Sequence, residues 1–143
     1  MTDIKQVQDE IIDEFAILEG DRESTIFYIM ELGNQLKNFP EEAYLDENLI
    51  KGCQSKVWLT TEEKDNKIIF KADSNTDITK GLISLLVRVL SERSPKEIIE
   101  ADLYFIDKIG MGNIIGSQRS NGLASMIKQM KLYALAYQSK LNV

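Results

Sequence analysis

The sequence predicts one α+β domain, in which a small antiparallel sheet of about three strands packs with several helices. Two short runs rich in β-branched and aromatic residues, 57–61 and 68–72, lie near the middle of the chain. Segments with the apolar spacing of helices lie on both sides of these runs. No linker, repeat or low-complexity stretch divides residues 1–143, and 43% apolar residues are enough for one core.

Two helices are predicted before the strands. Apolar residues at helical spacing over 4–18 indicate the first, which ends at Gly20. Asp21 is placed to cap a second helix with apolar residues as far as Leu36. Gly33 falls inside this second helix, where glycine costs about 1 kcal/mol relative to alanine. We therefore expect another element to pack closely against Gly33.

A β-hairpin is predicted after an irregular, acidic segment at 41–50. The two β-rich runs form its strands, and the Lys-Asp-Asn-Lys sequence at 64–67 forms its turn. Leu49 and Ile50 are available as a short third strand.

Further helices are predicted after the hairpin. Residues 78–90 are apolar nearly all round, which indicates the central buried helix. The Ser-Pro-Lys-Glu sequence at 94–97 is a capping box with proline at the first helical position. A short helix and the segment 103–109 follow, and the final helix is expected to begin near Ser120 or Asn121.

The charge is unevenly distributed along the chain. The net charge of −6 disfavours non-specific binding to nucleic acid. Residues 117–143 contain four cations and no acid, whereas the remaining 116 residues hold the other 13 cations and all 23 acids. Two interpretations remain open: a solvated helix with cations toward its C-terminus, or a face that docks a partner.

The sequence favours a cytoplasmic location without membrane insertion. It has no run of the roughly 18 to 20 apolar residues that a membrane span needs. The first residues are polar and acidic, and they lack the apolar core of a secretory signal. A single cysteine agrees with a reducing compartment, because it allows no internal disulfide.

Cys53 is the only cysteine, and it lies in a polar stretch just before the first strand. Lys51 and Lys56 on either side are expected to lower the thiol pKa modestly, and Gly52 frees the backbone. The chain contains no histidine and no second cysteine, which excludes a Cys–His catalytic pair and a dithiol. What remains is a nucleophile that takes up and passes on a group, or a half-buried inert thiol.

Other site chemistries fit poorly. Zinc or an iron–sulfur cluster needs several Cys or His ligands, so no metal site is expected; a carboxylate-only site stays open, but the acids match no loop pattern. The glycines at 110–116 are similar to a dinucleotide loop, but the third comes one residue late and a helix precedes them. A flexible connector accounts for them better. A one-cysteine peroxidase is disfavoured because Asp46 and Ile50 replace its Pro and Thr.

Several co-linear segments resemble the SufE family of sulfur-acceptor proteins. The most specific is the Gly-Cys-Gln-Ser-Lys-Val-Trp block at 52–58. The likeness covers nearly everything from residue 20 onward, whereas residues 1–20 show no convincing match. It includes the segments 28–33, 50–58, 72–74, 79–83, 94–98 and 118–123.

The resemblance implies a fold shared with IscU-type scaffolds and a covalent sulfur carrier that is not itself an enzyme and has no cofactor. A pyridoxal-phosphate cysteine desulfurase, SufS-like, would pass persulfide sulfur to Cys53, and a SufBCD-like scaffold complex would receive it. A pure adaptor that only regulates the desulfurase is the alternative. We expect the Cys53 sulfur to be sheltered in the free protein and to swing out when docked.

The resemblance also suggests roles for neighbouring residues. Arg119 aligns with an arginine linked to engagement of the desulfurase. Lys51 and Lys56 are expected to join it in partner binding, and the loop is expected to be supported by Gly52, Gln54 and Ser55. Many relatives carry an acid where this chain has Asn75, which can still cap a helix.

Overall fold

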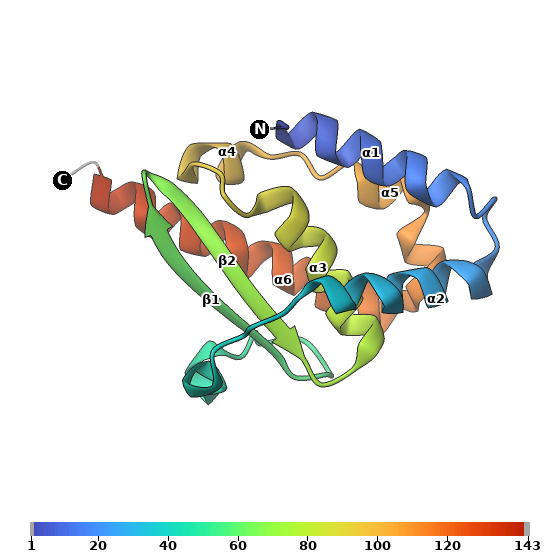
Figure 1. The fold of residues 1–143 in the computed structure, drawn as a ribbon, viewed down its shortest axis with the longest axis horizontal. Coiled ribbons are helices and arrows are strands. Elements are labelled where there is room, and N and C mark those ends of the chain that lie inside the picture. The colour runs from blue at the N-terminus through green and yellow to red at the C-terminus, as the bar shows by residue number, and fades with distance from the viewer. Residues whose placement is uncertain (1, 142–143) are drawn as a thin grey trace.

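A two-stranded antiparallel hairpin lies over a set of helices in the computed structural model, which describes residues 2–141 (Figure 1). Three 3₁₀ turns, η1 to η3, connect the second helix to the hairpin; they span Gly33–Gln35, Glu41–Ala43 and Asp46–Asn48. The α+β class is confirmed. The main elements are α1 (Ile4–Ala16), α2 (Arg22–Leu32), β1 (Val57–Lys64), β2 (Lys67–Ser74), α3 (Asp77–Leu90), α4 (Pro95–Glu100), α5 (Phe105–Ile109) and α6 (Met111–Leu141).

The hairpin has the predicted turn and longer strands than predicted. Its register pairs Lys64 with Lys67, so Asp65 and Asn66 form a two-residue loop. Both loop residues have positive φ, 55° and 64°, as a type I′ turn requires. The third strand expected at 49–50 is reduced to one isolated bridge between Leu49 and Trp58.

Helix α3 is the predicted central helix. Its buried residues lie on most of its circumference, and it packs against α2 and β2. Gly81 allows the closest approach: a Cβ there would lie 1.9 Å from the carbonyl oxygen of Ile29 in α2. The expected packing at Gly33 is also confirmed, because a Cβ there would lie 3.1 Å from the Gly81 nitrogen. Helix α2 ends at Leu32, however, so Gly33 caps the helix and Leu36 lies outside it.

Two predicted helix starts are confirmed in detail. The Asp21 side chain accepts a hydrogen bond from the Ser24 N–H at 3.0 Å. The Ser94 hydroxyl accepts from the Glu97 N–H, and a Glu97 carboxylate oxygen accepts from the Ser94 N–H. Helix α1 adds Val7, Ile11 and Phe15 to the core.

The final helix is interrupted at Gly116, a few residues before its predicted start near Ser120. Helix α6 begins at Met111, and non-helical dihedrals at Gly116 (φ 83°, ψ 170°) mark a kink within it. The prediction of a flexible connector over 110–116 is therefore wrong. The physical reason is burial, because Met111, Ile114 and Ile115 enter the core and hold residues 111–115 in a helical turn, whereas Gly116 itself is non-helical.

Candidate functional site

Cys53 lies in the loop 51–56, which follows the isolated bridge at Leu49 and leads into strand β1. Its side chain is half-buried. The Sγ atom donates a weak hydrogen bond to the carbonyl oxygen of Gly122 in α6, at 3.5 Å. Because Gly122 has no side chain, its backbone approaches the sulfur directly; a Cβ at Gly122 would already touch Sγ at 3.5 Å.

The C-terminal part of this loop is fastened to the connection between β2 and α3. The Lys56 N–H donates to the Asn75 side-chain oxygen at 2.9 Å, and the Asn75 N–H donates to the Lys56 carbonyl at 3.2 Å. The Ser74 hydroxyl donates to the same carbonyl at 2.8 Å. The Ser55 hydroxyl accepts from Thr76 at 2.9 Å and lies 3.3 Å from the Thr79 hydroxyl.

The N-terminal part of the loop is shaped by Gly52. Its φ of +93° belongs to the region that favours glycine. A Cβ at this position would lie 2.4 Å from the Ser125 hydroxyl oxygen in α6. A larger residue at position 52 would therefore have a strained backbone conformation and would force the Ser125 hydroxyl to move.

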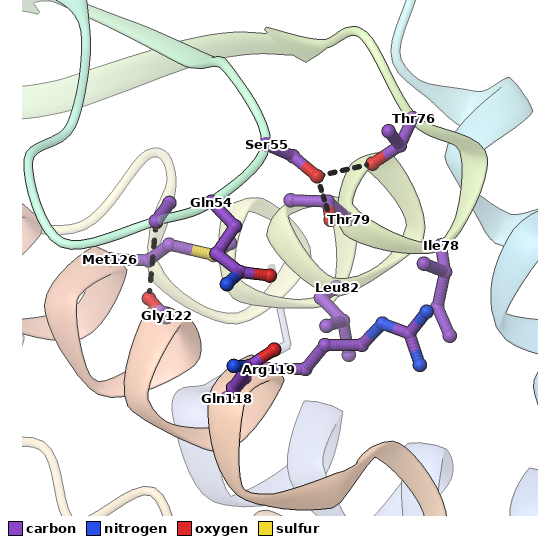
Figure 2. A pocket seen from close by; sticks show the side chains of 11 residues that line it. Gln54, Ser55, Thr76, Ile78, Thr79, Leu82, Gln118, Arg119, Gly122 and Met126 are labelled. Carbon is purple, nitrogen blue, oxygen red and sulfur yellow. Dashed lines mark hydrogen bonds between the residues drawn. The ribbon is translucent and has the colours of Figure 1, made fainter.

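A pocket of about 140 Å³ opens beside the sulfur (Figure 2). Figure 2 shows Arg119 extending from α6 toward Ile78, with Gln54 and Gln118 near the middle of the view. Hydroxyl, amide and guanidinium groups thus share the pocket with aliphatic side chains. The lining residues are Cys53, Gln54, Ser55, Thr76, Ile78, Thr79, Leu82, Gln118, Arg119, Gly122 and Met126.

Burial raises the pKa of the Cys53 thiol above its ordinary value of 9.0. The prediction that Lys51 and Lys56 would lower this pKa is wrong. Both lysines are exposed, so solvent screens their charges, whereas the half-buried sulfur lies against the Gly122 carbonyl of α6. The resting protein therefore holds a neutral thiol at neutral pH.

The structure brings some of the predicted site residues together and separates others. Cys53, Gln54, Ser55 and Arg119 line one pocket, whereas Lys51 borders a different groove on the other part of the loop. Sequence reasoning missed the residues that fasten the loop, because contacts between segments about 20 residues apart leave no periodic signal. These residues are Ser74, Thr76 and Thr79, together with the loop-fastening role of Asn75.

Two structural features are absent from residues 2–141. No group of three or more Cys, Asp or Glu side chains is arranged to hold a metal ion there. Within the same residues, no helix has both the length and the apolar character to cross a membrane.

A model of the SufE family, described as an Fe-S metabolism associated domain, matches residues 9–134. The chain belongs to the SufE family. The match includes the Cys53 loop, the hairpin and most of α6, so it covers the whole candidate site. It also includes residues 9–20, so the prediction that residues 1–20 have no family match is wrong from residue 9 onward. Family membership connects this SufE protein with iron–sulfur metabolism.

Curated relatives agree with this assignment. An uncharacterized SufE-like protein of Rhizobium meliloti (strain 1021) is 38% identical over 128 residues, covering 86% of this chain and 91% of that protein. One of Rhizobium etli is 39% identical, covering 86% of each. One of Synechocystis sp. (strain PCC 6803) is 33% identical, covering 74% of this chain and 67% of that protein.

The fold also occurs in a solved structure. The solution structure of a hypothetical protein from Thermus thermophilus superposes with a TM-score of 0.75, covering 93% of this chain and 96% of that one. Sequence identity is 16%, so this likeness shows a shared fold alone.

Proposed function

We propose that this SufE protein takes sulfur from a pyridoxal-phosphate cysteine desulfurase onto Cys53, stimulates that enzyme, and delivers the sulfur for iron–sulfur cluster assembly. The observation that carries this proposal is the placement of the only thiol. Its Sγ lies at the rim of a pocket, on a loop held by a small number of hydrogen bonds.

The transfer needs no metal and no histidine. The Cys53 thiolate attacks the terminal sulfur of the desulfurase persulfide, and a new S–S bond forms on Cys53. The S–S bond of the donor breaks, and its cysteine leaves as a thiolate. The proton released by the Cys53 thiol balances the charge on the departing thiolate. Because one S–S bond forms and one breaks, no external oxidant or reductant is needed.

A second transfer of the same kind empties the carrier. A thiolate of the SufBCD-like scaffold complex attacks the terminal sulfur on Cys53, and Cys53 leaves as a thiolate. Since the chain has no second cysteine, no thiol of its own can attack the persulfide and release sulfide.

In the free protein the Cys53 thiol is not ready for sulfur transfer, so docking of the desulfurase must change its position and its ionisation. The neutral, half-buried sulfur has to leave the Gly122 carbonyl and ionise. Each neutral hydrogen bond that fastens the loop contributes only about 1 kcal/mol, so a protein partner supplies enough binding energy to release it. Arg119 and Lys56 then favour the thiolate in the docked complex, while Lys51 contributes to partner binding.

Intact-protein mass spectrometry tests the carrier role. After mixing with a cysteine desulfurase, pyridoxal phosphate and cysteine, we expect the wild-type protein to gain the mass of one sulfur atom, which dithiothreitol removes. Cys53→Ser should gain none and should fail to stimulate desulfurase turnover. Ser139→Ala, an exposed and similarly small change remote from the loop, serves as the control. Full stimulation by Cys53→Ser would instead show a pure adaptor.

A further inference from the structure

A second groove lies next to the Cys53 loop, between β1 and the middle of α6. Its volume is about 380 Å³. Ile50 and Leu59 are buried and form an apolar floor. We name it the α6 groove; it is lined by Glu47, Asn48, Leu49, Ile50, Lys51, Leu59, Ser125, Lys128, Gln129, Leu132 and Tyr133.

The α6 groove is in direct contact with the sulfur loop. Lys51 belongs to its rim and lies two residues from Cys53. Ser125 belongs to its wall and fills the space where Gly52 would carry a Cβ. A molecule bound in this groove would therefore touch the element that has to move during sulfur transfer.

The solvent face of α6 continues the groove as an apolar strip. Leu132 and Leu135 are 47% and 52% exposed. Among the residues whose burial is described, only two other Leu or Ile side chains, Ile17 and Leu45, are exposed. With Lys128 they follow the i, i+4, i+7 spacing that places side chains on one helix face. A helix that packs against another helix uses this spacing for its contacts.

The C-terminal region that forms one side of the α6 groove is positively charged, whereas the protein as a whole is negatively charged. The chain from 117 onward carries no acid, although the protein as a whole has a net charge of −6. Lys131 is used internally, because it donates to the carbonyls of Ile99 and Ala101. Lys51 and Lys128 are exposed and make no ion pair within residues 2–141, and Glu47 is the single acid of the rim.

From these observations we infer that the α6 groove docks an amphipathic, acidic helix of the sulfur-donating cysteine desulfurase. The apolar side chains of that helix pack on Leu132 and Leu135 and enter the groove, while its carboxylates pair with Lys51 and Lys128. The inference rests on the proposed function, and it adds where and by what chemistry the donor is held. A second copy of this chain is a poorer occupant, since a two-fold contact would place identical lysines against each other.

Binding measurements test the inference with the full-length protein and the desulfurase as the probe. Leu132→Glu and Lys128→Glu are expected to raise the dissociation constant at least tenfold in isothermal titration calorimetry. Wild-type binding should also weaken as salt screens the lysines. Ile17→Glu is the matched control, because Ile17 is 79% exposed at the end of α1 and should bind like wild type.

Sulfur loading separates this inference from the proposed function. In the Leu132→Glu variant, Cys53 should gain sulfur slowly at low desulfurase concentration and completely at high concentration. The Cys53→Ser variant should gain no sulfur at any concentration. Normal loading combined with unchanged binding of Leu132→Glu overturns the groove inference alone. Failure of wild-type loading overturns the carrier function, whatever the binding result.

A photo-crosslinking residue at position 135 identifies the contacted segment. We expect the cross-linked desulfurase peptide to be helical in that enzyme and rich in Asp and Glu. A cross-link to another copy of this chain, or a change in its sedimentation caused by Leu132→Glu, would overturn the inference. Circular dichroism serves as the folding control. Because the substituted residues are exposed, every variant is expected to have the spectrum of the wild-type protein.

Discussion

Asn75 lies between β2 and α3, and its side chain accepts a hydrogen bond from the Lys56 N–H. The sequence suggested only a capping role for it, but Thr76 occupies the N-cap of α3. Asn75 instead joins the end of the Cys53 loop to the rest of the fold. The Asn75 side chain thus helps to hold the loop that places the sulfur beside Gly122.

Asn75→Ala should loosen the loop and expose the thiol. Loss of a hydrogen bond worth about 1 kcal/mol is expected to raise the iodoacetamide reaction rate of Cys53 about fivefold at fixed pH. Alkylation followed by mass spectrometry measures this rate. Ser94→Ala is the control, since it removes a helix cap of similar energy remote from the loop and should leave the rate unchanged. An unaltered rate in Asn75→Ala would mean that other contacts fasten the loop.

The crossing of α2 and α3 shows what decides packing between elements. The Ile29 carbonyl of α2 lies over Gly81 of α3 so closely that no side chain fits between them. The apolar sequence of α3 predicted its burial, and Gly33 predicted a close contact. The partner of each glycine became visible only in the folded chain.

Gly81→Ala is expected to destabilise the protein by about 3 kcal/mol, because a Cβ 1.9 Å from backbone must push two helices apart. Gly112→Ala, also in a helix, is the matched control. Its Cβ would meet only the Ser120 hydroxyl at 3.8 Å, so it should be neutral or stabilising by up to about 1 kcal/mol. Urea denaturation measures both. Equal stabilities of the two variants would contradict the packing argument.

At the scale of the whole molecule, one polar cluster joins the three helices α1, α2 and α3. Glu14 of α1 accepts hydrogen bonds from Tyr28 of α2, at 2.6 Å, and from Arg88 of α3. Arg88, and to a smaller extent Tyr28, hold the pKa of Glu14 below its ordinary value of 4.5, against the opposing effect of burial. Helix α1 is therefore attached by an ionised carboxylate as well as by its apolar face.

This cluster predicts a pH dependence of stability. The pKa of Glu14 is lower in the folded protein than in the unfolded chain. Ionised Glu14 therefore stabilises the fold fully above about pH 4.5, and this stabilisation is lost as the pH falls through the lower folded pKa. Glu14→Gln should cost about 2 kcal/mol at pH 7, since charge-assisted hydrogen bonds are lost. Its free energy of unfolding should also fall less steeply than that of wild type below pH 5. Urea denaturation at a series of pH values measures this. If the free energies of unfolding of wild type and Glu14→Gln fell in parallel below pH 5, Glu14 would not be the group responsible.

The sequence predicted the elements that depend on neighbours a few residues away. The capping box at Ser94 and the Asp-Asn turn of the hairpin are local hydrogen-bonding patterns, so they were recognisable in advance. The same holds for the single thiol of Cys53 and its family motif. The helical turn at 111–115 was not recognisable, because the glycines at 110–116 outweighed three apolar residues whose burial depends on distant partners.

By itself the sequence determined the α+β class and the family, and it singled out Cys53 as the proposed nucleophile. Only the tertiary structure decided the ionisation state of that nucleophile. Neighbouring lysines suggested a lowered thiol pKa, but the fold turns the lysines to solvent and the sulfur toward the Gly122 carbonyl, so burial raises it. The reason is physical: solvation and electrostatics depend on distances in space, and Gly122 lies 69 residues from Cys53 along the chain.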